Sequence, residues 1–167
     1  MRAPDIFGQS LSKPVFITAL RMLAGKRLSK AQLTKKLRDR GFPPDIVREA
    51  VDECERRKYV DDRTFAQLFV TNALEKKPVG PLRLMRDLIK QGIDGDLARE
   101  IVAETEADHD ERLERAIRKL EAARPGERFD RLALRLVTQG FTAGAIARAL
   151  RQRAARGQTI EEPEEMP

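Results

Sequence analysis

The chain has 167 residues and a formal net charge of +6, with 36% charged and only 5% aromatic side chains. This composition suits solvated helices around narrow aliphatic stripes and argues against a thick β-sandwich core. The single cysteine excludes an internal disulfide, and the single histidine excludes a histidine-rich metal site. We therefore expect an intracellular protein that binds no metal and no cofactor.

Positive charge gathers in two stretches of the chain. Residues 26–58 contain 11 basic and 6 acidic side chains, and residues 127–157 contain 7 basic and 2 acidic ones. Residues 59–126 are near neutral, with 12 basic and 14 acidic side chains. The two basic stretches are either solvated helix surfaces or binding surfaces for a polyanion or an acidic partner, and the sequence leaves both interpretations open.

The two terminal segments lack a helical period. We expect residues 1–13 to form a flexible arm and residues 158–167, with four glutamates around prolines, to form an acidic disordered tail. No run approaches the roughly 20 apolar residues that cross a bilayer. The beginning of the chain also lacks the apolar segment of a signal peptide. We expect a cytoplasmic protein that does not contact a membrane.

Three helices are expected between residues 14 and 58. An apolar stripe that begins at a proline and ends near Gly25 predicts the first. Ser29 and Gln32 have the spacing of a capping box and predict the start of the second, which Gly41 ends from the C′ position. Two prolines are tolerated in the first turn of the third helix, which runs to about residue 58.

Three more helices are expected between residues 59 and 104. Asp61 or Asp62 can cap the fourth helix of the chain. The segment Pro78–Pro81 around Gly80 is a strong break, and two further helices follow it.

The last three helices are expected between residues 105 and 157. No glycine or proline separates Ile101 from Arg124. The sixth helix therefore either continues into the seventh or kinks at residues 108–110, and the sequence does not decide between these two. A turn of proline and glycine leads into the last two helices, so the pattern predicts nine helices and no sheet.

A repeat relates the three groups of helices. In each group two leucines one helical turn apart are followed by a glycine and a bulky apolar residue, and the glycines lie 51 and 48 residues apart. The three copies are Leu33, Leu37, Gly41, Phe42; Leu84, Leu88, Gly92, Ile93; and Leu132, Leu136, Gly140, Phe141. This spacing is typical of stacked helical units. We predict an all-α, elongated and curved array of three tandem three-helix repeats, over residues 14–58, 59–104 and 105–157.

The sequence offers little from which to build a catalytic site. Asp61 and Asp62 could act as acid and base, but helix capping is the preferred interpretation. Cys54 lies in an apolar stretch and is expected to fill the core, whereas His109 lies among acidic residues and is expected to be solvated. Glycine-rich phosphate-binding motifs are absent from the sequence. We expect a protein that is not an enzyme.

A helix–turn–helix interpretation of the glycine turns is weak. The helices that follow the turns begin with prolines, aspartates or small residues, none of which reads base edges. Nonspecific contact with single- or double-stranded DNA through phosphates stays open. The candidate contact residues are Lys30, Lys35, Lys36, Arg38, Arg40, Arg128, Arg131, Arg135, Arg148, Arg151 and Arg153.

Three segments resemble a known family. They are SKAQLTKKLRDRG at residues 29–41, YVDDRTFAQLFV at residues 59–70 and GPLRLMRDLIKQGI at residues 80–93. They follow in the order and spacing of the RecX family of regulators of the RecA recombinase, and the resemblance extends from about Leu20 to Leu150. The candidate structural residues are Gly41, Asp61, Asp62, Phe65, Phe69, Gly80, Gly92 and Gly140.

The resemblance implies a monomeric, non-enzymatic regulator in homologous recombination, DNA repair and the SOS response. Such a protein binds the RecA filament on DNA and restrains ATP hydrolysis, strand exchange and co-protease activity. Two alternatives stay open, namely a helical module that binds DNA nonspecifically without RecA, and a structural adaptor. Whether the acidic tail competes with DNA for the basic stretches also stays open.

Overall fold

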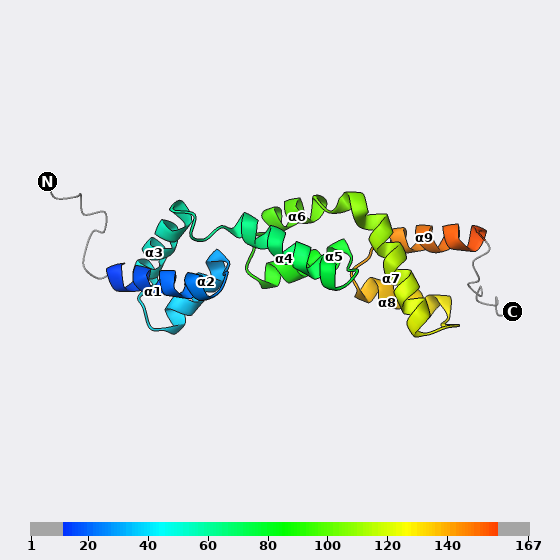
Figure 1. Cartoon of the computed structure of the whole chain (residues 1–167), viewed down its shortest axis with the longest axis horizontal. Coiled ribbons are helices and arrows are strands. Elements are labelled where there is room, and N and C mark those ends of the chain that lie inside the picture. Colours follow the sequence, from blue (N-terminus) through cyan, green and yellow to red (C-terminus); the bar gives the residue numbers. More distant parts are fainter. Residues whose placement is uncertain (1–11, 157–167) are drawn as a thin grey trace. The chain divides into compact units, whose positions relative to one another are not determined.

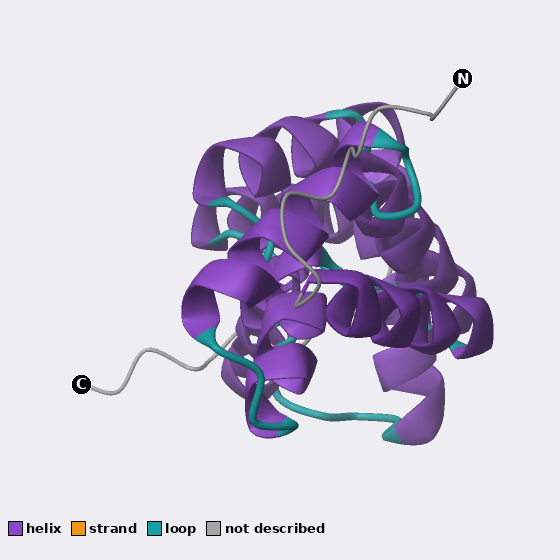
Figure 2. Ribbon diagram, turned by 90° about the vertical axis from the view of Figure 1, so that its left-hand side faces the viewer, coloured by secondary structure: helices purple, strands orange, loops and turns teal. Residues whose placement is uncertain are grey.

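The structure is a computed structural model that describes residues 12–156. The expected acidic tail and nearly all of the expected arm lie outside the described residues. In the described part, Figure 2 shows helices and connecting loops but no strand. The prediction of an all-α chain is confirmed.

Nine α-helices and one short 3-10 helix are found between residues 12 and 156 (Figure 1). They are α1 (Ser12–Gly25), α2 (Lys30–Asp39), α3 (Pro44–Arg56), α4 (Asp62–Lys76), α5 (Pro81–Lys90), α6 (Gly95–Ala103), η1 (Glu106–Asp108), α7 (His109–Ala123), α8 (Phe129–Thr138) and α9 (Ala143–Ala155). Each expected helix has a counterpart, so the tandem arrangement of three-helix repeats is confirmed as α1–α3, α4–α6 and α7–α9.

The helices form two compact units. The first contains the described residues up to Leu68 together with Ile89–Asp94, and the second contains Phe69–Leu88 and the described residues from Gly95 onward. The middle repeat contributes to both units. The domain boundaries expected near residues 58 and 104 stay predictions, as do the elongation and the curvature.

The first repeat has its own apolar cluster. The buried side chains of this first cluster are Val15, Phe16, Ala19, Leu28, Leu33, Leu37, Val47, Ala50, Val51, Cys54 and Val60. Burying a Leu or Val side chain stabilises a fold by about 1.5–3 kcal/mol, so this cluster supports α1–α3. The expectation that Cys54 fills the core is confirmed, because its side chain is completely buried.

The third repeat has a second, separate apolar cluster. Its buried side chains are Leu113, Ala116, Ile117, Leu132, Leu136, Phe141, Ala145, Ile146, Ala149 and Leu150. They come from all three helices of the repeat and from the residue that follows its glycine turn. No buried side chain belongs to both clusters among the described residues.

The predicted start and end of α2 are confirmed. The Ser29 hydroxyl accepts from the Gln32 N–H at 3.2 Å, and the Gln32 side chain accepts from the Ser29 N–H at 3.3 Å. These two hydrogen bonds satisfy donors that a helix N-terminus leaves free. After α2, Gly41 has φ of +85°, a left-handed conformation that favours glycine.

The chain breaks between α6 and α7, which the sequence left undecided. Arg112 is 1% exposed, and its guanidinium donates to the Thr105 carbonyl at 2.7 Å and to the Thr105 hydroxyl at 3.2 Å. The His109 N–H donates to the Glu106 carbonyl, three residues back, so the helical hydrogen-bond pattern is interrupted next to the Thr105 carbonyl that Arg112 binds. Arg112 thus stabilises the break that η1 follows.

The structure corrects one expectation about side-chain exposure. His109 is buried at 7% exposure, with its ring centroid 5.8 Å from that of Phe141, so it is not solvated. Phe65 and Phe69, which the sequence named as candidate structural residues, are half-buried, and that role stays a prediction. Ala66 and Val70 are buried side chains of the same helix, α4.

Candidate binding surfaces

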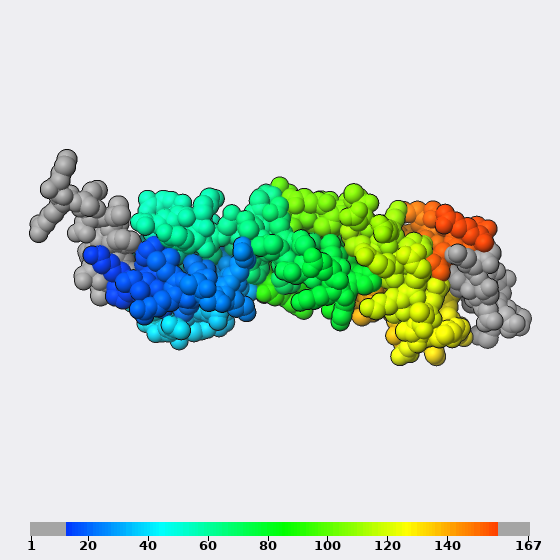
Figure 3. Space-filling view, in the orientation of Figure 1, coloured from blue at the N-terminus to red at the C-terminus, as the bar shows by residue number. Residues whose placement is uncertain are grey.

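The exposed side of α2 is the first candidate surface. Lys30, Lys35 and Arg38 line a shallow open groove of about 680 Å³. Asp62 and the turn at Gly92 also line the groove. The α2 segment lies on the face shown in Figure 3, in blue. The structure thus brings three of the predicted contact residues together.

Two cations of the groove are already paired with carboxylates. The Lys30 ammonium contacts Glu55 and, at 3.2 Å, Asp52, and the hydrogen bond to Glu55 raises the pKa of Lys30. The Lys35 ammonium lies 2.7 Å from Asp39 on the next turn. Exposed pairs of this kind contribute little to stability, but they reduce the net positive charge that a partner meets.

The remaining predicted cations of this helix are different. Lys36, Arg38 and Arg40 are exposed, and no ion pair is described for their side chains. Their charges near the C-terminus of α2 are favoured by the helix dipole. We call these three residues the α2 cations.

In the third repeat, three of the predicted arginines have acidic neighbours. Arg128 lies 3.3 Å from Asp130, Arg135 lies 3.0 Å from Glu127, and Arg148 lies 3.8 Å from Asp110. Arg131 and Arg151 are exposed, and no ion pair is described for their side chains. These two stay available for contact with a partner.

Arg153 does not belong to a surface. It is 9% exposed, and its guanidinium lies 2.8 Å from Glu114 and 2.6 Å from Glu121, both on α7. These two ion pairs join α9 to α7. The structure therefore corrects the expectation of an exposed Arg153, and we leave it out of the proposed contact surface.

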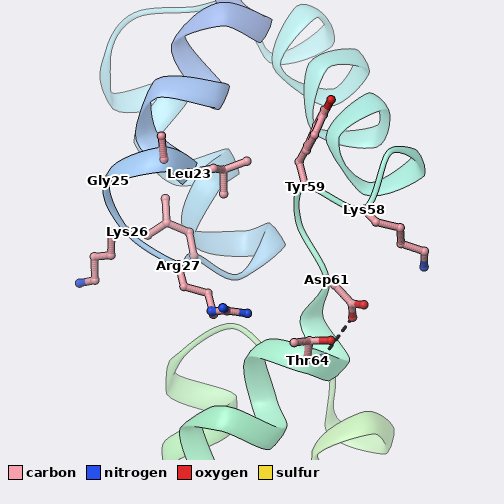
Figure 4. A pocket seen from close by; sticks show the side chains of 10 residues that line it. Leu23, Gly25, Lys26, Arg27, Lys58, Tyr59, Asp61 and Thr64 are labelled. Carbon is pink, nitrogen blue, oxygen red and sulfur yellow. Dashed lines mark hydrogen bonds between the residues drawn. The ribbon is translucent and has the colours of Figure 1, made fainter.

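A second hollow in the first unit was not expected from the sequence. It has a volume of about 430 Å³ and is lined by the loop after α1 and the loop after α3 (Figure 4). Lys26 and Lys58 point outward on opposite sides of it, while Arg27 points toward Asp61. Because these cations do not converge, the hollow extends the basic surface rather than forming a pocket for one ion. The sequence could not reveal it, because packing of α1 on α3 brings the two loops together.

Asp61 and Asp62 have structural roles. Asp61 caps α4 by accepting from the Thr64 N–H at 3.2 Å, and this hydrogen bond lowers the pKa of Asp61 (Figure 4). Asp62 accepts from the Lys30 N–H at 2.7 Å, while burial raises the pKa of Asp62. The preference for capping over catalysis is thus confirmed for Asp61, and Asp62 connects the starts of α4 and α2.

The glycine turn at Gly92 packs tightly against the start of α2. The Ser29 hydroxyl donates to the Gln91 carbonyl at 2.6 Å, and the Gln32 amide donates to the Gln91 side chain at 2.7 Å. A Cβ on Gly92 would lie 2.4 Å from the Cβ of Ala31. The sequence indicated glycine for its conformation, and the structure adds that there is no room for a side chain.

The glycine turn at Gly140 packs against the start of α5 in the same way. The Gly80 N–H donates to the Gln139 carbonyl at 2.9 Å, and the Leu82 N–H donates to the Gly140 carbonyl at 3.1 Å. A Cβ on Gly80 would lie 2.2 Å from the Gly140 carbonyl carbon, and one on Gly140 would lie 2.4 Å from the Arg83 backbone nitrogen. We call the contacts at Gly92 and Gly140 the two joints.

Between residues 12 and 156, no group of three or more His, Cys, Asp or Glu side chains could hold a metal ion. Within the same residues, no helix has the length and apolar character needed to cross a membrane. What the structure does provide is exposed, unpaired cations on a helical scaffold. It defines a tandem three-helix repeat protein.

Comparison with known proteins finds similarity to RecX proteins. The family model of the RecX first three-helix domain matches residues 16–54. A regulatory protein RecX of Chlorobium phaeobacteroides is 27% identical over 142 residues, which cover 84% of this chain and 93% of that protein. The regulatory protein RecX of Streptomyces coelicolor is 29% identical over 138 residues, covering 80% and 73% of the two chains. Over most of its length the chain is similar to RecX regulatory proteins.

Solved structures support the fold. The crystal structure of RecX from Lactobacillus salivarius matches with a TM-score of 0.75 at 18% identity, covering 86% of this chain and 97% of that one. A second crystal structure of a regulatory protein RecX matches with a TM-score of 0.76 at 16% identity, covering 84% and 72%. The resemblance inferred from the three sequence segments is therefore confirmed.

Proposed function

We propose that this protein is a non-enzymatic regulator that binds the RecA filament on DNA and mainly inhibits RecA ATP hydrolysis, strand exchange and co-protease activity. The similarity to regulatory proteins RecX supports RecA as the partner. The observation that supports the mode of binding is the set of α2 cations, Lys36, Arg38 and Arg40, which are exposed and have no described carboxylate partner. Arg131 and Arg151 supply further positive charge in the third repeat.

Binding would regulate RecA if this protein has a higher affinity for one conformational state of the RecA filament than for another. A ligand shifts a conformational equilibrium only when it binds one state better than another. A protein with cations on more than one repeat can contact several phosphates or acidic side chains at once. Binding that favours one state of the filament would then slow the cycle of conformations that accompanies ATP hydrolysis.

The test is the ATPase activity of RecA on single-stranded DNA with increasing amounts of the purified protein. We expect the wild type to inhibit and the triple variant Lys36→Glu, Arg38→Glu, Arg40→Glu to inhibit at least tenfold less. Arg48→Glu is the control, because this exposed cation on α3 already lies 3.5 Å from Asp45. Equal inhibition by the wild type and a correctly folded triple variant would remove the α2 cations from the proposal.

The second candidate function is nonspecific DNA binding without RecA, and the α2 cations favour it as well. Each lost contact with a duplex phosphate lowers the salt dependence of log K by roughly 0.9. If all three α2 cations contact phosphates, the triple variant should lower the slope by roughly 2.7. Tight, salt-dependent DNA binding together with unchanged RecA activity would support this alternative and contradict the proposed regulation.

A further inference from the structure

The end of α3 has the hydrogen bonds of a glycine-ended helix, but it has a lysine in place of the glycine. The Lys58 N–H donates to the Glu55 carbonyl and the Tyr59 N–H donates to the Cys54 carbonyl, both at 2.9 Å. These two bonds, three and five residues back, form a Schellman motif, in which the first donor is usually a glycine. The turns at Gly41 and Gly140 close α2 and α8 with the same two bonds.

The backbone of Lys58 is in a conformation that disfavours a side chain. Its φ is +60°, and the other residues of positive φ in the described part of the chain are all glycines. A Cβ makes this conformation unfavourable, because it comes too close to the following carbonyl oxygen. A lysine thus occupies a position where glycine would be the more stable choice, which points to a role for its side chain.

Tyr59 also departs from the usual form of the motif. The residue after the left-handed position normally packs on the helix that it follows, as Phe141 does at 0% exposure. Tyr59 is 50% exposed instead. Its ring centroid lies 6.4 Å from that of Phe16, which is buried, so the ring has a support on one side. The rest of the ring is accessible to a flat partner.

Three exposed cations lie around this ring. Lys26, Arg27 and Lys58 line the same hollow as Tyr59, and no ion pair is described for their side chains. Among the described residues that line the hollow, the one carboxylate is Asp61, which already accepts from the Thr64 N–H. Lys26 and Lys58 point outward on opposite sides (Figure 4). This arrangement suits phosphates spaced along a strand better than a single ion.

We propose that this hollow binds single-stranded DNA, with an unpaired base stacked on Tyr59 and the neighbouring phosphates in contact with Lys58 on one side and Lys26 on the other. Proteins that bind single strands combine cations along the backbone with aromatic rings under the bases. An acidic protein segment would use the cations but has no flat group for the ring. The inference rests on the proposed contact with the DNA of the RecA filament and assigns that contact a place and a preference for unpaired bases.

The fluorescence of the wild type tests the stacking directly. Tyr59 is the single tyrosine of the chain, which has no tryptophan, so tyrosine emission reports on this site. A base stacked on the phenol ring quenches its emission. We expect an oligothymidylate of about 12 nucleotides to lower the emission on binding, after correction for absorption by the DNA. An abasic strand of the same length should bind more weakly and leave the emission unchanged.

Variants of the tyrosine separate stacking from charge. Tyr59→Ala should lower the affinity for the oligothymidylate by roughly fivefold or more, the contribution of one base stacked on an aromatic ring. Tyr59→Phe keeps the flat ring and should keep the affinity. Anisotropy of a labelled strand measures both, and thermal unfolding shows that the variants are folded.

Lys58→Gly tests the cation without risk to the fold. Glycine suits the left-handed conformation, so the melting temperature should be unchanged or higher. The salt dependence of log K should decrease by roughly 0.7, the value for one lost contact with a single-strand phosphate. Arg48→Ala is the matched control, because this exposed cation of α3 pairs with Asp45 and does not line the hollow.

Three results would overturn the proposal. They are no binding of the oligothymidylate at low salt, equal affinity for the normal and the abasic strand, and unchanged emission when the strand is bound. Equal affinity for the two strands would mean that the hollow contacts only phosphates or other anions such as acidic side chains. RecA is absent from these measurements, whereas the proposed function fails if the wild type does not inhibit RecA, so the two failures are distinguishable.

Discussion

Asp61 and Asp62 are sequence neighbours whose carboxyl groups titrate in opposite directions. The cap hydrogen bond lowers the pKa of Asp61, and burial raises the pKa of Asp62. One carboxylate therefore stabilises the fold when it is ionised, and the other costs stability when it is ionised. Two single substitutions should separate these effects.

Asp61→Ala should destabilise the protein by about 1 kcal/mol at neutral pH, because the first turn of α4 loses its cap. Since the folded pKa of Asp61 lies below its unfolded value, this contribution is present above the unfolded pKa and is lost as the pH falls through the folded pKa. Urea unfolding at neutral and acidic pH measures it. A difference between wild type and variant that persists at the acidic end would contradict the assignment.

Asp62→Asn should leave stability unchanged or raise it at neutral pH. The amide oxygen can still accept from the Lys30 N–H, while the cost of a buried charge disappears. Because the folded pKa of Asp62 is raised, protonation stabilises the wild type as the pH falls through that pKa, and the advantage of the variant should shrink there. The same unfolding series, run beside Asp61→Ala, provides the comparison.

Cys54 should react slowly with alkylating reagents in the native protein. Burial raises the pKa of the thiol from 9.0 to about 11, and only the thiolate reacts. At a pH well below both values, a thiol whose pKa is higher by about 2 has an approximately 100-fold smaller thiolate fraction. Labelling followed by mass spectrometry, with and without denaturant, measures the ratio, and fast labelling of the native protein would mean that this part of the first cluster opens readily.

Residues with a clear apolar or capping context could be predicted from the sequence. Cys54 and Ser29 are examples, because helical period and cap spacing determine their surroundings. The burial of Arg153 and His109 could not be predicted, because an arginine or a histidine among charged neighbours in the sequence is expected to be solvated. Their burial depends on groups 32 or more positions away, such as Glu121 and Phe141.

At the scale of helices, the positive-φ glycines fall into two classes. Gly92 and Gly140 combine a left-handed conformation with a lack of space, whereas Gly41 and Gly126 have only the conformation. Substitution should therefore be more costly in the joints than at the open turns.

Gly126→Ala should cost roughly 1–2 kcal/mol from backbone conformation alone. Gly140→Ala should cost more, because its Cβ would also lie 2.4 Å from the Arg83 backbone nitrogen and the two segments of the chain would have to move apart. Thermal unfolding of the two variants compares them directly. Equal losses of stability would show that the joint at Gly140 is loose in solution.

Helix starts and ends followed from caps, prolines and glycines, and these local signals placed nearly all boundaries correctly. The break between α6 and α7 could not be predicted from these local signals. It depends on the guanidinium of Arg112 bonding to a carbonyl seven positions earlier, a contact that no propensity encodes. The two joints could not be predicted from the sequence either, because glycine is expected in such a turn whether or not another helix packs against it.

At the scale of the whole molecule, stability is divided between two separate apolar clusters. Leu37 and Leu136 occupy the same repeat position, four residues before a glycine, and both are fully buried. Leu37 belongs to the first cluster and Leu136 to the second. This pair allows a matched test of how independent the two clusters are.

Leu37→Ala should destabilise the first repeat by about 2–5 kcal/mol and Leu136→Ala the third repeat by a similar amount. Hydrogen exchange should then increase mainly in the repeat that has the substitution. If either substitution increases exchange equally in α1–α3 and α7–α9, the two clusters unfold together and the division is wrong.

The first cluster has one more consequence, which concerns synthesis. All of its buried members lie between Val15 and Val60. They are therefore available as soon as that stretch has left the ribosome, before translation of the third repeat is complete. Since domains fold as units from the N-terminal end during translation, the nascent first repeat can become a compact body before its joint with Gly92 is made.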